Sequence, residues 1–313
     1  MNLALIFRYV HALIVSIENN SALSFAEVVE GASHDSFTRT LHKSGQWLRV
    51  LIAFVTKSAL GKGYLILDDT ILEKYTQGLK CIFKLKDSKT GNYVYGLNIV
   101  LLCWSDGKRC IPLLFHIYRG KGVSKLDLAM QLLAFAHDVL NLEPEYVLFD
   151  SYYGSRALMQ QILSYNWHFV TRLKKNRKLN GQQIKRWRGG IPYWSAQGYL
   201  EGKIPVMVYR HAAKYFVSSN IELTRQHIRD LYKQRSPIEE VFRVLKQECG
   251  WQGCQLRSPT AYRRHLQAGL LAFLFLDSLK SKYKASHYKL RKRCISRKIF
   301  VTTDDVAAFF MPA

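Results

Sequence analysis

Four residues in the last third of the chain combine an aromatic ring, two cations and a carboxylate at helical spacing. Tyr232, Arg235, Glu239 and Lys246 follow the pattern Y-x2-R-x3-E-x6-K. At about 100° per residue, an ideal helix would place all four on one stripe roughly 60° wide. The apolar residues between them lie mostly on the opposite face and can pack against a core. A carboxylate among cations suits a site that binds metal ions and grips phosphate groups.

A local explanation of Glu239 competes with the metal site. The segment from Ser236 to Glu239 also matches a capping box, with Pro237 at the first helical position. On this interpretation Glu239 closes the start of a helix, and Tyr232 and Arg235 lie in the turn before it. Two further carboxylates favour the metal site over the cap.

Those two carboxylates, Asp68 and Asp150, each follow a short apolar run that is typical of a buried strand. The runs are Tyr64–Leu67 and Tyr146–Phe149. If the two strands are neighbours, their ends bring the aspartates together, and the later helix supplies Glu239. Three hard oxygen ligands suit Mg²⁺ or Mn²⁺. Two such ions, about 3.5–4 Å apart, can drive phosphodiester cleavage without a side-chain nucleophile.

Each of two ligands has a rival next to it in the sequence. Side chains alternate along a strand, so only one of Asp68 and Asp69 can face the metal ions if the strand continues through both. Glu240 lies about 100° around the helix from Glu239, away from the stripe.

The elements that must position these residues alternate between strands and helices. Strands are expected at 64–67, 95–104, 110–118, 146–149 and 167–173, with a hairpin turn at Ser105–Gly107. Helices are expected at 126–140, after a cap at Ser124, and at 155–163 and 262–279. Three strands that can pair as a meander, followed by two that are joined through helices, predict a mixed β-sheet flanked by helices. This is the RNase H-like order.

The sequence also suggests a division into regions. Residues 1–58 form an N-terminal helical region, in which a capping box at Ser24–Glu27 and the segment 33–43 fit either a helix-turn-helix DNA reader or a helical cap on the core. A catalytic domain over 59–173 and 223–280 is interrupted by a small β-rich insertion at 174–222. Residues 281–313 form a basic C-terminal tail, which binds DNA or is simply solvated and disordered.

Composition narrows the class of protein and its partners. The chain has 313 residues, 48% of them hydrophobic, and a formal net charge of +23. Such a charge attracts polyanions, either nucleic acid or an anionic membrane, of which only nucleic acid also fits the motifs. The six scattered cysteines fit reduced thiols and form no zinc-ligand pattern. The N-terminus lacks the basic start of a signal peptide and the apolar runs are too short for a membrane span. We therefore expect a cytoplasmic protein without membrane contact.

These motifs resemble those of the DDE transposases of bacterial insertion sequences, specifically the family-four group. The Tyr/Arg/Glu/Lys spacing matches that family's signature at every position. The segment Asp68–Thr70 resembles its first motif, with Asp68 as the ligand. The segment Asp150–Gly154 resembles its second, an aspartate followed by an aromatic residue and glycine. The resemblance covers roughly residues 63–280.

The resemblance implies a function as well as a fold. It implies an RNase H-like core that hydrolyses DNA at transposon ends and then directs the freed 3′-hydroxyl at target DNA. Tyr232, Arg235 and Lys246 would hold the phosphates of the terminal inverted repeats, and a homodimer would hold the paired ends. Relatives can also place a tryptophan of the insertion against a flipped base, which makes Trp187 and Trp194 candidates, although a packed role suits each.

Two other functions fit parts of the pattern. An RNase H-like nuclease or resolvase outside transposition would share the metal site but would not depend on transposon ends. A non-catalytic, DNA-binding remnant of a transposase would keep the fold without turnover. The presence of Asp68, Asp150 and Glu239 argues against a decayed site.

Overall fold

A computed structural model describes residues 3–17, 21–43, 45–58, 60–74, 79, 81–86, 90–120, 122–201 and 203–311, apart from the side chains of 188–190. Position 59, where the sequence analysis starts the catalytic domain, lies outside these residues. Among the described helices, none combines the length and the apolar character that crossing a membrane requires.

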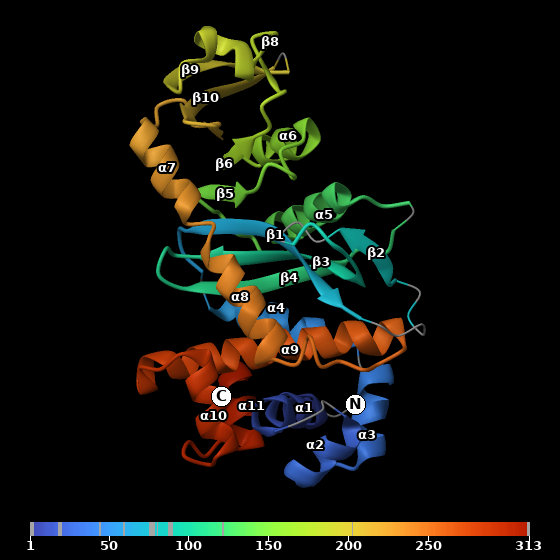
Figure 1. The fold of residues 1–313 in the computed structure, drawn as a ribbon. Coiled ribbons are helices and arrows are strands. Elements are labelled where there is room, and N and C mark those ends of the chain that lie inside the picture. Colours follow the sequence, from blue (N-terminus) through green and yellow to red (C-terminus); the bar gives the residue numbers. More distant parts are fainter. Residues whose placement is uncertain are drawn as a thin grey trace.

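One mixed sheet runs through the molecule and positions the two candidate catalytic aspartates (Figure 1). The described strands are β1 (Tyr64–Glu73), β2 (Phe83–Lys86), β3 (Tyr93–Ser105), β4 (Cys110–Ile117), β5 (Tyr146–Phe149), β6 (His168–Leu173), β7 (Lys178–Leu179), β8 (Gln182–Gln183), β9 (Tyr193–Leu200), β10 (Ile204–His211) and β11 (Lys214–Ser218).

The centre of this sheet has the predicted order. β4, β3 and β1 pair antiparallel, and β1, β5 and β6 pair parallel. The parallel strands are connected through α5 (Lys125–Asp138) and α6 (Arg156–Ser164). Ser124 caps α5 in a full capping box, as expected. The mixed sheet flanked by helices that the sequence predicted is therefore confirmed.

The length of β1 differs from the prediction. The sequence suggested a strand that ends at Leu67, but β1 continues through both aspartates to Glu73. Pairing with β5 stops at Leu67, whereas pairing with β3 continues from Asp68 as far as Glu73. The strand can extend because its second neighbour satisfies its backbone groups on one side.

The insertion is rich in strands, but these strands belong to the central sheet. β11 pairs antiparallel with β6, and β10, β9, β7 and β8 follow in that order. A sequence pattern cannot show this pairing because it joins segments far apart in the chain. After β11, α7 (Arg225–Lys233) and α8 (Pro237–Gln247) bring the chain back to β1, as Figure 1 shows along the left of the view.

The remaining helices pack beneath the sheet around one long helix. They are α1 (Leu3–Val15), α2 (Ala22–Val28), α3 (His34–Lys43), α4 (Trp47–Lys57), α9 (Pro259–Tyr283), α10 (His287–Ile295) and α11 (Thr303–Phe310). In Figure 1, α1 to α3, α10 and α11 lie on the side of α9 away from the sheet, and both chain ends lie there. Residues 281–311 are thus not a disordered tail: the ring of Phe310 stacks on that of Phe7, 6.1 Å between centroids.

One detail of the N-terminal region also differs from expectation. Helix α2 begins at Ala22 with Ser21 as its cap, so the capping box expected at Ser24–Glu27 is wrong. In α3, Thr40 is buried and its hydroxyl donates to the carbonyl of Ser36 at 2.7 Å. DNA reading by α3 stays a prediction.

A buried histidine joins the N-terminal helices to α9. The hydroxyl of Tyr9 lies 2.8 Å from Nδ1 of His265, and Nε2 of His265 lies 2.8 Å from the carbonyl of Gly250. A neutral ring satisfies both contacts if Nε2–H donates to the carbonyl and Nδ1 accepts from the tyrosine. Complete burial lowers the pKa of His265 from its ordinary 6.5 to about 4.

This histidine makes the fold sensitive to acid. Because the unfolded chain binds a proton below pH 6.5 and the folded chain does not until about pH 4, stability falls as the pH drops through this window. At pH 5 we expect a loss of about 2 kcal/mol in the free energy of unfolding relative to pH 8. Urea titrations at both pH values measure it. His265→Gln should flatten the dependence, whereas His42→Gln on the exposed face of α3 should not; equal slopes for both variants would contradict this account.

Candidate active site

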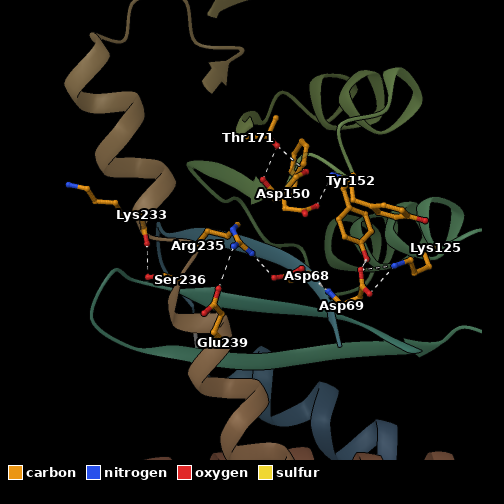
Figure 2. Close-up of polar contacts among 12 residues, drawn as sticks. Asp68, Asp69, Lys125, Asp150, Tyr152, Thr171, Lys233, Arg235, Ser236 and Glu239 are labelled. Atoms are coloured by element: carbon orange, nitrogen blue, oxygen red, sulfur yellow. Dashed lines mark hydrogen bonds and ion pairs between the residues drawn. The ribbon is translucent and has the colours of Figure 1, made fainter. Parts of the chain in front are cut away.

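The pairing of β1 with β5 brings Asp68 and Asp150 together. The last paired residues of these parallel strands are Leu67 and Phe149. Asp68 and Asp150 come next on each strand, so both lie where the strands separate. Figure 2 shows the two carboxylates near this point. Two segments that are far apart in the sequence thus place like charges side by side.

Asp68 lies in a largely buried, polar position. Its side chain is 19% exposed, and one carboxylate oxygen, Oδ1, accepts the backbone N–H of Asp69 at 2.9 Å. The other, Oδ2, accepts from Nη1 of Arg235 at 2.5 Å. Burial raises the pKa of Asp68 to about 6; Arg235 opposes this shift, and Asp150 and Asp69 add to it. The position therefore favours a cation next to Asp68.

Asp69 has a different set of partners. Its Oδ1 accepts from the hydroxyl of Tyr153 at 2.7 Å, and its Oδ2 accepts from Nδ2 of Asn98 at 2.7 Å. Nζ of Lys125 contacts both oxygens, at 3.0 and 2.9 Å. Both oxygens are engaged by protein donors. This arrangement supports Asp68, and not Asp69, as the candidate ligand.

The segment with the Tyr/Arg/Glu/Lys pattern is two helices and not one. α7 ends at Lys233 and α8 begins at Pro237, so Tyr232 and Glu239 lie on different helices. Proline lacks an N–H and cannot continue the hydrogen bonding of α7. The capping box is also absent, because the Ser236 side chain makes no cap bond and its hydroxyl donates to the carbonyl of Lys233 at 2.9 Å. Glu239 is therefore not used as a cap.

Arg235, in the turn between these helices, bridges two of the candidate ligands. Besides its bond to Asp68, its Nη2 lies 3.7 Å from Oε1 of Glu239 (Figure 2). The Arg235 side chain is 16% exposed, whereas that of Glu239 is 61% exposed. The guanidinium thus places positive charge between the two carboxylates.

The other two residues of the pattern flank this centre. The ring of Tyr232 packs edge-on against Phe216, 5.2 Å between centroids, and lies 5.7 Å from the guanidinium of Arg235. Nζ of Lys246 donates to the carbonyl of Ile71 on β1 at 2.7 Å. Tyr232 is thus in contact with β11 and Arg235, and Lys246 with β1 three residues beyond Asp68.

A cavity of about 430 Å³ opens beside the aspartates. Asp68 and Asp150 line it together with Lys125 and Lys246, whereas Glu239 is not among its lining residues. Its size and its lysines suit a phosphate-bearing segment of a larger ligand.

The three candidate metal ligands, Asp68, Asp150 and Glu239, do not converge in this structure. Across the part of the chain that the structure describes, no three His, Cys, Asp or Glu side chains are grouped closely enough to hold a metal ion. The donor set nevertheless fits Mg²⁺ or Mn²⁺, because Asp68, Asp150 and Glu239 offer hard oxygens only. Arg235 already places a cation between two of them, which shows that the site favours positive charge.

The two tryptophans of the insertion pack against each other, 6.2 Å between ring centroids. Trp194 is 2% exposed and cannot stack on a base without rearrangement. Trp187 is half-buried. The packed role therefore fits Trp194.

Sequence reasoning missed three residues that hold Asp69. Lys125 directly follows the cap of α5, and Asn98 lies within an apolar strand; neither position has a local signal of function. Tyr153 belongs to the Asp150–Gly154 segment, which drew attention as a motif but gave no role for the hydroxyl.

Comparison with known proteins found similarity over most of the chain. The family model described as transposase DDE domain matches residues 60–275, which contain β1, β5 and α8. No curated protein matches the sequence. Among solved structures, the chain is similar to the piggyBac transposase in a cryo-EM synaptic complex with hairpin DNA, with a TM-score of 0.55 and 14% identity, covering 100% of this chain and 78% of that one. The family match spans well over half of the 313 residues, and the chain therefore belongs to the transposase DDE domain family.

Proposed function

We propose that this transposase cuts double-stranded DNA at the ends of a transposable element by metal-dependent hydrolysis and then joins the freed 3′-hydroxyl to target DNA. One observation carries the proposal: Asp68 and Asp150 lie side by side, and Glu239 faces Asp68 across a single guanidinium. The resemblance to a transposase solved with hairpin DNA supports DNA as the substrate.

Asp68, Asp150 and Glu239 would hold two Mg²⁺ ions, for which Mn²⁺ would substitute. When bound, such ions activate the attacking oxygen and stabilise the leaving 3′-oxygen. The protein supplies the geometry: the sheet holds two carboxylates on a rigid frame, and α8 brings the third from one side. Glu239 is exposed enough to turn toward the aspartates by a side-chain rotation.

The cations around this centre would bind the DNA backbone. Lys246 lines the cavity beside the aspartates, and Tyr232 lies next to Arg235, which contacts Asp68. A net charge of +23 would draw DNA to the protein. A homodimer would hold two transposon ends together for strand transfer.

In this proposal Arg235 binds either Asp68 or a DNA phosphate, but not both at once. A guanidinium bonded to Asp68 cannot at the same time bind a phosphate with the same N–H groups. When a phosphate draws Arg235 away, Asp68 and Glu239 lose their cation and become available for metal. DNA binding and metal binding should therefore strengthen each other.

Replacement of the carboxylates tests the proposed catalysis. Asp68→Asn, Asp150→Asn and Glu239→Gln should each lower Mg²⁺-dependent cleavage by about 10²–10³-fold, because each removes an anionic metal ligand that stabilises charge in the transition state. The substrate is DNA that carries the terminal inverted repeats flanking the coding region. Glu240→Gln is the matched control, since Glu240 is the residue after Glu239 on α8 and is paired with Arg243.

Full cleavage by Glu239→Gln would remove Glu239 from the site. Cleavage that does not depend on the terminal repeats would favour a general nuclease. Repeat-specific binding without any cleavage would favour a DNA-binding remnant.

Replacement of Arg235 tests the exchange between carboxylate and phosphate. Without DNA, Arg235→Gln should bind Mn²⁺ about tenfold more tightly, because a hydrogen-bonded charge pair of about 1.5 kcal/mol no longer competes for Asp68. The same variant should bind transposon-end DNA more weakly. Mn²⁺ titration by electron paramagnetic resonance and fluorescence anisotropy with labelled DNA measure the two effects.

Lys233→Gln is the control for this experiment, because Lys233 is an exposed cation nearby that is paired with Asp230. If Arg235→Gln and Lys233→Gln change the Mn²⁺ affinity equally, general electrostatics explains the effect and the exchange is refuted.

The salt dependence of DNA binding tests Lys246. Lys246→Ala should reduce the slope of log K against log salt by about 0.9, as expected for the loss of one phosphate contact. Lys108→Ala, in the exposed β3–β4 turn, should leave the slope unchanged. An unchanged slope for Lys246→Ala would mean that Lys246 does not contact phosphate.

A further inference from the structure

We infer that Tyr153 is a positioning residue, whose bond to Asp69 holds the two aspartate-bearing segments together. Asp69 and its three partners, Tyr153, Lys125 and Asn98, form a brace, in which Asp69 is not a metal ligand. The inference rests on the proposed function, since it concerns the same metal site. It assigns roles to Tyr153, Asp69 and Lys125.

The brace crosses between two strands at the point where their pairing stops. Tyr153 follows Asp150 by three positions and is completely buried. Its hydroxyl donates to Oδ1 of Asp69 at 2.7 Å, and Asp69 is the neighbour of Asp68. Beyond Leu67, no backbone pairing joins β1 to the segment after β5. The bond from Tyr153 to Asp69 therefore joins the two segments beyond the last backbone pair of β1 and β5.

The same turn orients the carboxylate of Asp150. The backbone N–H of Tyr153 donates to the carbonyl of Asp150 at 3.2 Å, and that of Tyr152 donates to Oδ1 of Asp150 at 2.8 Å. The hydroxyl of Thr171 on β6 holds the carbonyl of Phe149 at 2.8 Å. These bonds hold the turn that carries Asp150, and the bond from Tyr153 to Asp69 attaches this turn to β1.

Lys125 and Asn98 complete the brace from the other side. Lys125 pairs with Asp69 at 2.9 Å, and both side chains are mostly buried. The Nζ of Lys125 also lies 4.1 Å from the centre of the Tyr152 ring. Without Lys125, Asp69 would be a third, uncompensated negative charge beside Asp68 and Asp150. Its oxygens are committed to protein donors, so the strands would offer a metal ion two aspartates and not three.

Metal affinity depends on such supporting contacts. Removing a hydrogen bond that orients a ligand costs about 10–100-fold in metal affinity in other proteins. The effect arises because a loosened carboxylate must be ordered again when the metal binds. A brace that acts on two ligands at once should therefore change metal affinity more than it changes the fold.

The test is Mn²⁺ titration of the full chain without DNA, followed by electron paramagnetic resonance. Tyr153→Phe removes one hydroxyl and keeps the buried ring, and it should weaken Mn²⁺ binding about tenfold. Tyr146→Phe is the matched control: its hydroxyl accepts a bond from Asn220 at 3.0 Å at the opposite end of β5. Tyr146→Phe should bind Mn²⁺ like the unmodified chain.

Thermal unfolding separates positioning from simple stabilisation. If Tyr153→Phe lowers the melting temperature but leaves the Mn²⁺ affinity unchanged, Tyr153 is only structural and the inference is overturned. If Tyr153→Phe does not fold, Asp69→Asn decides, because asparagine keeps an oxygen that can accept from Tyr153. Asp69→Asn should keep the number of bound Mn²⁺ ions, whereas Asp68→Asn should reduce it.

An equal loss of bound ions in Asp69→Asn and Asp68→Asn would make Asp69 a ligand and refute the brace. A chain that binds no Mn²⁺ at all would refute the proposed function, and the inference with it. A chain that binds Mn²⁺ and loses it in Asp68→Asn, but in which Tyr153→Phe behaves like Tyr146→Phe, would refute the inference alone.

Discussion

Two carboxylates held side by side repel each other, and the repulsion between Asp68 and Asp150 is the constraint on which this site depends. Burial of Asp68 raises its pKa to about 6, mainly because the charged carboxylate loses water, and the charges of Asp150 and Asp69 add to this rise. Two cations reduce the negative charge at this position, and each pairs with a different aspartate. Lys125 neutralises Asp69 inside the sheet, and Arg235 neutralises Asp68 at its edge. The first is enclosed by the brace, whereas the second lies in a turn from which it can move.

The scaffold explains why this placement is reliable. Parallel pairing of β1 and β5 sets the register of both aspartates, and the sheet continues through β11, from which α7 and α8 return to β1. Arg235 and Asp68 meet although 167 positions separate them in the sequence. α9 and the helices beneath it support the sheet from one side. The buried contact between Tyr9 and His265 joins this lower layer to α9.

Much of this site could be predicted from the sequence, because its main signals are local. The apolar run Tyr146–Phe149 forms a strand with the expected bounds, and the next residue is Asp150. The length of β1 could not be predicted in this way, since it depends on pairing with β3. The capping box at Ser236 failed for a related reason: local pattern allows it, but the actual path of α7 into α8 uses the serine differently.

The residues that support Asp69 could not be predicted from the sequence, and the reason is physical. Lys125, Asn98 and Tyr153 each bind Asp69, which lies far from each of them in the sequence. Their residue types and spacing carry no periodic signal. The Arg235 bridge was also unexpected, because the helical stripe suggested a phosphate partner and not a carboxylate.

We propose that Asp68, Asp150 and Glu239 surround one metal centre. To test this, Fe²⁺ replaces Mg²⁺, and ascorbate and peroxide are added, so that hydroxyl radicals cut the polypeptide next to the bound ion. With transposon-end DNA bound, we expect cuts close to positions 68, 150 and 239, which excess Mg²⁺ should suppress. Cuts near 68 and 150 without one near 239, or cuts that persist in Asp68→Asn, would contradict this proposal.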